Sequence, residues 1–520
     1  MGAAASGHDQ IHARSVLAPG PALALIALTA LLCARLVPDV AAKPLHEDEA
    51  VAGLISARPL GDMLHTVLVD RGGAPLHFVL AHFALAIDTT PEALRWVSVV
   101  FALATVPLCY DLARRVAGQS AGLIAAALAA TSQLLLIYGT FGRMYSLFAF
   151  ASTLAADLFV RALERPQRRP ALAAAVTALL PLAVHPFGAF LFAAEAAVAL
   201  FLWRGHALRA ALPVLAVAVI AAPLLLADLR LSERYGPEVG RNLDSGTSSA
   251  GATLQALGGA AGGRGATLIL STVLAAAGLL ALARRRPPLA AFAVFTLAVP
   301  PAALAIAGAA GLFSERLAPR HLIFMLPLWI TLVATGATRL SALLPSKLRT
   351  AAVAGIVAAA ALAPSSVSEP RTMPTGAERA VAAPAAWLTK ELAPRDVLYP
   401  YSPVFLAALP VAREARAYSR EPVALARAVK RTGATRAVYM SVPLREPMNG
   451  SGLRRAGVRF RAFPSWLILE SRGPFSDGTA ALESAVKTLG TAAPLVAEAR
   501  AHAYLEQLRV AACVALRRSC

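Results

Sequence analysis

The sequence predicts a polytopic α-helical membrane protein with a small C-terminal α/β domain. Of the 520 residues 57% are hydrophobic and only 15% are charged, and the mean hydropathy is +0.61. A soluble protein averages about 25% charged residues. Apolar runs recur from Ser15 to Pro364, many of them near the roughly 20 residues that span a bilayer. Too few charges remain to cover a water-facing surface, so these runs are expected to cross the membrane.

Basic clusters interrupt the apolar part of the chain. The positive-inside rule places such clusters in the cytoplasm. Between consecutive clusters the chain is long enough for two helices joined by a short outer turn, and the short N-terminus sends the first span outward. We therefore expect about eleven spans, with the N-terminus inside and the C-terminus outside. The clusters are Arg114-Arg115, Arg161 with Arg165, Arg168 and Arg169, Arg204 with Arg209, Arg284 to Arg286, and Arg339 with Lys347 and Arg349.

Residues 1–364 form the predicted membrane domain, with a first outer loop at residues 38–74. The apolar segment Pro75 to Ile87 follows this loop and is too short for a straightforward span. We interpret it as a re-entrant or surface helix. The Gly/Ser-rich stretch from Asp244 to Gly265 is expected to be a mobile loop.

Residues 365–520 differ in character, because strand-like and helix-like segments alternate there. Such alternation predicts a small α/β domain, which the parity of the spans places outside. The expected strands are Asp396 to Tyr401, Ala437 to Val442 and Trp466 to Ser471, and the expected helices are Val423 to Thr432 and Thr479 to Leu489.

The net charge of +19 includes +10 from residues 365–520, which hold 22 basic and 12 acidic residues. A strongly basic chain is often a nucleic-acid binder. Here the basic residues of the apolar part stand at helix ends, where the positive-inside rule explains them, so no nucleic acid is expected. Cys33 and Cys109 fall in apolar runs, whereas Cys513 and Cys520 lie close together, and the spacing leaves their pairing open.

Three successive carboxylates follow the first span in the segment His46-Glu47-Asp48-Glu49-Ala50. Mutual repulsion and nearby lipid raise carboxylate pKa values, which suits a general base. The alternative is an acidic turn that only caps a surface helix. Other polar side chains that the span parity brings to the same face favour a catalytic site. They are Arg143, Tyr145, His185, Glu315, Arg316, Arg320 and His321.

Carboxylates combined with several guanidinium groups suit an acceptor hydroxyl and a phosphate leaving group, because arginine forks match phosphate oxygens. No Asp-x-Asp metal motif and no phosphate-binding glycine loop occurs, so a nucleotide-sugar donor is not expected. No cofactor is predicted with certainty. The segment Glu47-Asp48-Glu49 has the chemistry for a divalent metal, but nothing in the sequence fixes one.

Five short motifs follow one another in the apolar part, and their order and spacing carry more weight than any one of them. They are Asp48-Glu49-Ala50 after the first span, Ala74-Pro75-Leu76-His77-Phe78, Arg95 before the apolar run that ends in Arg114-Arg115, the outer turn Gly142-Arg143-Met144-Tyr145-Ser146-Leu147, and Pro319-Arg320-His321-Leu322 before a span that contains Pro327.

This series resembles the GT-C glycosyltransferases of the protein O-mannosyltransferase and lipid A aminoarabinose-transferase type, over roughly residues 15 to 345. The sequence departs from the family pattern at His321, where an aromatic residue is usual, and at Ala74, where proline is frequent. The resemblance implies a GT-C fold and a sugar donor linked to polyprenyl phosphate. The acceptor would be a lipid, a glycan or a protein. The reaction would take place on the outer face of the plasma (inner) membrane.

The resemblance also implies a role for each matched residue. Asp48 would act as the general base, and the acceptor oxygen would displace the phosphate with inversion through an oxocarbenium-like state. Arg320, with Arg143, would stabilise the departing phosphate. The remaining candidates would contact substrate; these are Glu47, Glu49, Tyr145, His185 and His321.

Two other classes of function remain open. A polytopic transporter or lipid flippase would use Glu195, because intramembrane carboxylates often mark proton or substrate paths; the absence of internal repeats weighs against it. A non-enzymatic assembly factor would bind cell-envelope polymers through the charge of +10 on residues 365–520.

Overall fold

The structure is a computed structural model that describes residues 19–71, 74–165, 167–202, 219, 222, 248–260, 263, 265–310, 318–362 and 380–517. Within these ranges six helical segments are long and apolar enough to cross a membrane. They are α1 (Pro19–Ala42), α5 (Pro91–Ala117), α8 (Tyr145–Glu164), α15 (Ala266–Arg285), α16 (Pro287–Ala309), and the 3-10 helix η3 (Pro319–Met325) with α17 (Leu326–Ser341).

Shorter helices pack among these segments. They are α6 (Gln119–Ala130), α7 (Gln133–Tyr138), α9 (Arg168–Thr177), α10 (Leu179–Val184), α11 (Gly188–Ala197) with the π-helix η2 (Val198–Leu202), α14 (Ser249–Ala260) and α18 (Ser346–Leu362). The predicted polytopic helical fold is confirmed. The count of about eleven spans and the orientation stay predictions, and the boundary between residues 364 and 365 lies outside the described residues.

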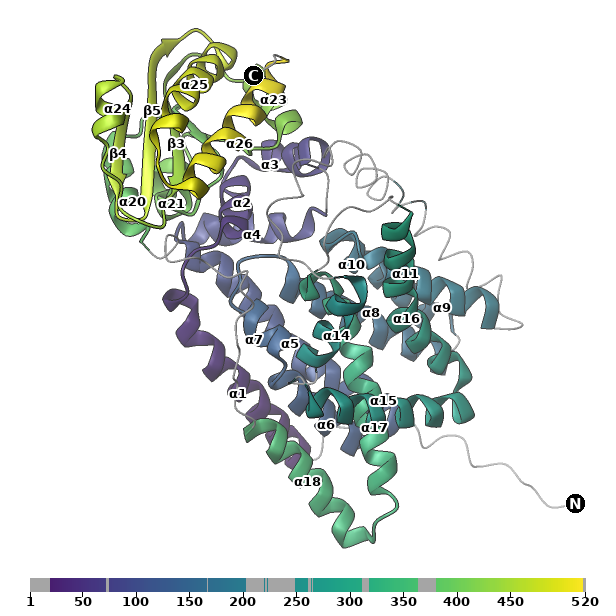
Figure 1. The fold of residues 1–520 in the computed structure, drawn as a ribbon. Helices are drawn as coiled ribbons and strands as arrows, with labels where there is room; N and C mark the ends of the chain where they lie inside the picture. The colour runs from purple at the N-terminus through teal and green to yellow at the C-terminus, as the bar shows by residue number, and fades with distance from the viewer. Residues whose placement is uncertain are drawn as a thin grey trace, which may run out of the picture.

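The first outer loop is largely helical. Helix α1 continues through Pro38 to Ala42, and the chain then forms α2 (Glu47–Ser56), α3 (Leu60–His65) and the π-helix η1 (Thr66–Arg71). The short apolar segment after the loop is α4 (Leu76–Ile87), a 12-residue helix, which is too short to cross the hydrocarbon unaided. These helices form a layer at one end of the membrane part (Figure 1).

The prediction of a mobile loop from Asp244 to Gly265 is wrong for Ser249–Ala260, because these residues form α14. Small residues let this helix approach α7 closely. A Cβ atom built on Gly259 would come within 3.2 Å of Leu134 Cγ, and the Ser132 hydroxyl donates to the Gly259 carbonyl at 3.1 Å. The glycines that suggested a loop are therefore packing positions.

The C-terminal region is an α/β domain built on a five-stranded sheet in the order β2-β1-β3-β5-β4. Strand β1 pairs in parallel with β2 and β3, whereas β5 is antiparallel to β3 and β4. The three predicted strands correspond to β1, β3 and β5 and are confirmed. The strands are β1 (Val397–Tyr399), β2 (Arg416–Ala417), β3 (Thr435–Pro443), β4 (Arg459–Phe463) and β5 (Trp466–Phe475).

Helices cover both faces of this sheet. The predicted helices correspond to α23 (Pro422–Lys430) and α25 (Gly478–Ala492) and are confirmed. The others are α20 (Ala382–Glu391), α21 (Pro403–Ala407), α22 (Leu409–Ala412), α24 (Ser451–Arg455), the 3-10 helix η4 (Ala493–Leu495) and α26 (Ala499–Ala515). Cys513 is disulfide-bonded, and its partner lies outside the described residues.

The two faces of the sheet belong to different hydrophobic clusters. Along β3, Val438 and Met440 pack with α23, α25 and α26, whereas Tyr439 packs into a second cluster. This second cluster also contains Leu54 and Ile55 of α2. Alternate residues of a strand point to opposite faces, so one face of the sheet shares its core with the first outer loop. Figure 1 shows the domain, coloured green to yellow, seated on the layer of α2 to α4.

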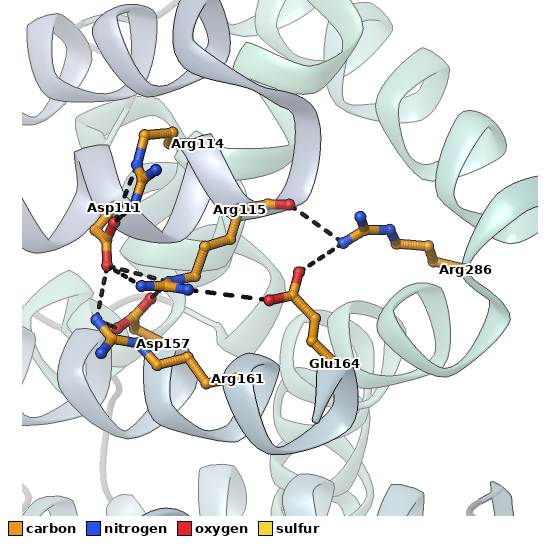
Figure 2. Close-up of polar contacts among 7 residues, drawn as sticks. All are labelled: Asp111, Arg114, Arg115, Asp157, Arg161, Glu164 and Arg286. Atoms are coloured by element: carbon orange, nitrogen blue, oxygen red, sulfur yellow. Dashed lines mark hydrogen bonds and ion pairs between the residues drawn. The ribbon is translucent and has the colours of Figure 1, made fainter. Parts of the chain in front are cut away.

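A polar cluster lies at the C-terminal end of α5 (Figure 2). The carboxylate of Asp111 accepts hydrogen bonds from Arg114, Arg115 and Arg161. The fully buried Asp157 of α8 pairs with two of these guanidinium groups, those of Arg115 and Arg161. Arginines from the expected cytoplasmic clusters therefore meet at one end of the bundle.

Candidate functional site

The three acidic residues occupy the first turn of α2 and point in different directions. His46 caps the helix: its Nδ1 atom accepts from the Asp48 amide at 3.0 Å, and its own amide donates to Glu49 Oε2 at 3.0 Å. Acidic residues stabilise the N-terminus of a helix. Because successive side chains on a helix diverge by about 100°, each carboxylate meets a different environment.

Glu49 is a structural residue. Its side chain is 2% exposed, and its oxygens accept four hydrogen bonds: two from Arg95 at 2.8 Å, one from the Gly142 amide at 2.9 Å and one from the His46 amide. A carboxylate offers about four lone-pair positions, so none is left for a ligand. The structure therefore does not support the expected substrate contact of Glu49.

Arg95, near the start of α5, is the partner of Glu49, and all five of its N–H groups are used. Besides its two bonds to Glu49, the guanidinium donates to the carbonyls of Val40, Lys43 and Pro44 at 2.7 to 3.0 Å. An arginine has five such donors. Arg95 therefore joins the end of α1 to the first turn of α2 and fixes the position of Asp48.

Asp48 is the acidic residue that faces the other candidates. Its side chain is 32% exposed, and its carboxylate lies 3.9 Å from His46 Nδ1. Arg143 Nη1 donates to the Asp48 backbone carbonyl at 3.2 Å. The carboxylate also interacts electrostatically with Tyr138 and His321. Residues from three separate parts of the chain, near positions 46, 138 to 143 and 321, therefore lie near Asp48.

Aromatic and imidazole rings pack together near Asp48. The ring centroids of His185 and His321 lie 5.8 Å apart. The centroid of the Tyr145 ring lies 6.3 Å from that of His185 and 6.4 Å from that of His321. Phe148 stacks on His185 at 5.0 Å. The helical path is interrupted at His185, because α10 ends at Val184 and α11 begins at Gly188. The break turns the imidazole toward η3.

Arg320 lies in η3, next to His321. Its guanidinium stands 5.8 Å from the centre of the Tyr145 ring and interacts with Tyr138, in the arrangement of a cation–π contact. The structure thus gathers Asp48, Arg143 and Arg320 with the imidazole and phenol rings, as the sequence predicted. Glu315 and Arg316 lie outside the described residues.

Glu47 meets a residue that the sequence did not indicate. Its Oε1 atom lies 3.3 Å from Nη1 of Arg420, which belongs to the C-terminal domain. Burial by itself would lower the pKa of Arg420, but the nearby carboxylates, above all that of Glu47, outweigh burial and raise it. No motif in the sequence could have found Arg420, because its position next to α2 depends on domain packing.

No metal site is formed in the part of the chain that the structure describes. There, no group of three or more His, Cys, Asp or Glu side chains is arranged to hold an ion. The acidic residues of α2 diverge instead, since Glu49 turns to Arg95 and Glu47 to Arg420.

A cavity of about 1240 Å³ opens between the two domains. Arg35, Asp39 and Lys43 of the α1 end line one side, and Glu92 of α5 and Thr389 of α20 line others. Lys43 pairs with Asp39 at 3.0 Å. None of the candidate substrate-binding residues lines this cavity, so it is a space separate from the Asp48 cluster.

Glu195 lies in α11 and is 4% exposed. Its Oε1 atom has no hydrogen-bond partner among the described residues. Such a carboxylate is costly to bury in its charged form.

The chain is similar to known glycosyltransferases by family and by fold. Residues 72–227 match the family model for dolichyl-phosphate-mannose-protein mannosyltransferase. The apo crystal structure of ArnT from Cupriavidus metallidurans matches with a TM-score of 0.55 at 13% identity, over 86% of this chain and 98% of ArnT. ArnT bound to undecaprenyl phosphate matches with a TM-score of 0.51 at 12% identity, over 87% and 98%. A search of curated proteins found no match.

These findings confirm the predicted resemblance to the GT-C glycosyltransferases. The chain is an integral membrane enzyme of the glycosyltransferase class. The transporter and assembly-factor hypotheses are therefore set aside. Identities of 12–13% establish the fold and not the roles of single residues, so those roles rest on the geometry above.

Proposed function

We propose that this membrane glycosyltransferase moves a sugar from a polyprenyl-phosphate carrier to an acceptor hydroxyl on the outer face of the plasma membrane. The observation that carries the proposal is that Asp48, Arg143 and Arg320 all lie near the imidazole of His321, with Arg143 bonded to the Asp48 carbonyl. Two comparisons support the donor class: the matching family is described by a dolichyl-phosphate sugar, and one structure of the similar fold holds undecaprenyl phosphate. The acceptor is a lipid, a glycan or a protein.

Asp48 is the general base in this proposal. Of the three acids in the first turn of α2, Glu49 has no free lone pair and Glu47 is paired with Arg420. The Asp48 side chain is 32% exposed and lies near Tyr138 and His321, while Arg95 holds the neighbouring Glu49. It takes the proton of the acceptor hydroxyl while the oxygen forms its bond to the anomeric carbon. The bond from that carbon to the phosphate oxygen breaks on the opposite face, so the configuration inverts.

Arg320 and Arg143 bind the phosphate that leaves. A planar guanidinium can donate two parallel hydrogen bonds to phosphate oxygens, and a positive charge stabilises the phosphate most as its negative charge develops. Arg320 is held over Tyr145, and Arg143 is held by its bond to the Asp48 carbonyl. The rings of Tyr145, His185 and His321 pack against one another beside Arg320.

The test is Asp48→Asn, which keeps side-chain shape and removes the basic oxygen. Turnover with a polyprenyl-phosphate sugar should fall by about 10² to 10⁴, the usual contribution of a positioned base. Binding of the lipid donor and the amount of folded protein should be unchanged. Full turnover by Asp48→Asn would refute the assignment of the base.

Arg320 is tested in the same assay. Arg320→Lys keeps the charge but loses the planar fork, so it should reduce transfer, and Arg320→Ala should reduce it further. Both variants at wild-type activity would mean that Arg320 only anchors η3.

A further inference from the structure

The loop between β2 and α23 brings one side chain of the C-terminal domain to the first turn of α2. Arg420 stands in this loop, and its Nη1 atom lies 3.3 Å from Glu47 Oε1. The side chains of Arg420 and Glu47 are 22% and 35% exposed. Glu47 immediately precedes Asp48, so a charge from the C-terminal domain stands beside the proposed base.

The loop that carries Arg420 is fixed on both sides. On the membrane side, Arg58 donates to the Tyr401 hydroxyl at 3.1 Å and contacts the Ala417 carbonyl. Inside the domain, the Glu421 amide donates to the hydroxyl of the buried Ser419 at 3.2 Å. Arg420 is therefore not a free surface arginine that happens to meet an acid.

Electrostatics link Arg420 to both acids of the turn. The charges of Glu47 and Asp48 both stabilise the guanidinium, and the attraction acts equally in the other direction. Arg95 neutralises Glu49 from the buried side. Arg420 therefore adds a positive charge beside two neighbouring carboxylates in the first turn of α2, where the imidazole of His46 lies 3.9 Å from Asp48.

We propose that Arg420 is a positioning residue of the transfer site, supplied by the C-terminal domain. It holds Glu47 away from Asp48 and keeps a fixed positive charge beside the proposed base. The inference rests on the proposed function, because it assigns a task to Arg420 only if Asp48 takes part in transfer. It also assigns the C-terminal domain a part in the reaction site, beyond covering the first outer loop.

Arg420→Gln tests the inference in the full-length protein. The kcat for transfer from a polyprenyl-phosphate sugar should fall by about 10- to 100-fold, because a misplaced catalytic group has costs of this order. The KM for the donor should change little, since the phosphate is assigned to Arg143 and Arg320. Arg420→Lys keeps a positive charge in the same place and should restore part of the kcat.

Arg427→Gln is the matched control. Arg427 also reaches from the C-terminal domain to the first outer loop, but it contacts η1, donating to the Val69 carbonyl at 3.0 Å and lying 3.8 Å from Asp70. Its loss should leave kcat within about twofold, because Arg427 lies away from the first turn of α2 and the buried Asp70 keeps His65 at 3.5 Å. Combining Arg420→Gln with Glu47→Gln should cost no more than the larger single loss, because paired residues are not additive.

Each outcome decides the matter. Wild-type kcat in Arg420→Gln, with Asp48→Asn inactive, would overturn the inference and leave the proposed function standing. Equal losses in Arg420→Gln and Arg427→Gln, together with lowered melting temperatures, would reduce Arg420 to a docking contact and also overturn it. Absence of transfer by the wild-type protein from any polyprenyl-phosphate sugar would refute the proposed function, and the inference with it.

Discussion

At the scale of single residues, the pair of Arg95 and Glu49 is the most constrained feature of the site. Each N–H of the guanidinium and each lone pair of the carboxylate has a partner within 3.0 Å. The pair joins the end of α1, the first turn of α2 and the turn at Gly142. A Cβ atom at Gly142 would come within 3.1 Å of Glu49 Oε1, so a glycine allows this close approach.

Glu49→Gln should damage folding rather than chemistry. The substitution leaves Arg95 as an uncompensated buried charge, and removing one partner of a buried ion pair costs about 3–5 kcal/mol. The NH2 group of glutamine would also stand donor against donor with either the His46 amide or the Gly142 amide. We expect less folded protein in the membrane and a lower melting temperature in detergent.

Glu47→Gln is the control for this prediction. Glu47 is 35% exposed, and an exposed ion pair contributes about 0–1 kcal/mol to stability. Its melting temperature should therefore stay near that of the wild type. Equal stability of Glu49→Gln and Glu47→Gln would contradict the structural role of Glu49.

At the scale of elements, α5 and α8 connect the candidate site to the arginine cluster of Figure 2. Arg95 and Arg115 stand near the two ends of α5. Twenty residues of helix rise about 30 Å, close to the thickness of the hydrocarbon layer. The Asp48 cluster and the network around Asp111 and Asp157 therefore lie a membrane thickness apart.

Asp157→Asn should destabilise the packing of α5 against α8 at the end that carries the arginine cluster. Asp157 is fully buried and pairs with Arg115 and Arg161 at 3.1 and 2.6 Å. Both arginines keep Asp111 as a partner, so we expect a loss of about 1–3 kcal/mol, the range for a buried polar group left without its partner. A lower melting temperature with unchanged kcat per folded molecule would agree.

Arg286→Gln serves for comparison at the same end of the bundle. The side chains of Arg286 and Glu164 are 42% and 30% exposed, and such a pair contributes little. A loss of stability as large as that of Asp157→Asn would argue against burial as the source of the difference.

At the scale of the whole molecule, the C-terminal domain and the first outer loop form one body. Leu54 and Ile55 of α2 share a hydrophobic cluster with Leu398 and Tyr439 of the sheet. Four arginines connect the two parts, and these are Arg58, Arg420, Arg427 and Arg431. Both parts must therefore lie on the same side of the membrane.

Reporter fusions test this arrangement. Fusions after Leu60 and Ser402 should both read outside, whereas fusions after Arg168 and Arg286 should read inside by the positive-inside rule. Opposite readings at Leu60 and Ser402 would contradict the shared core. If the fusions after Leu60 and Ser402 both read inside, the fold would stand and the proposed outer location would be wrong.

Much of the fold followed from patterns that are local in sequence. Apolar runs of membrane length predicted helices such as α5 and α8, and short strand-like segments predicted β3 and β5. The strand β4 was missed. This strand lies at the edge of the sheet, and Arg459 and Arg461 make it polar. Polar residues in an edge strand weaken the hydrophobic pattern from which strands are predicted.

By itself the sequence determined the membrane class, the α/β character of the C-terminal region and the group of side chains that meet near Asp48. It did so because hydropathy, periodicity and motif order are local properties. Only the tertiary structure decided which partners the three neighbouring carboxylates meet. Glu49 is taken by an arginine 46 positions away, and Glu47 by Arg420 from the other domain. Contacts at that separation depend on packing, which no local pattern of residues encodes.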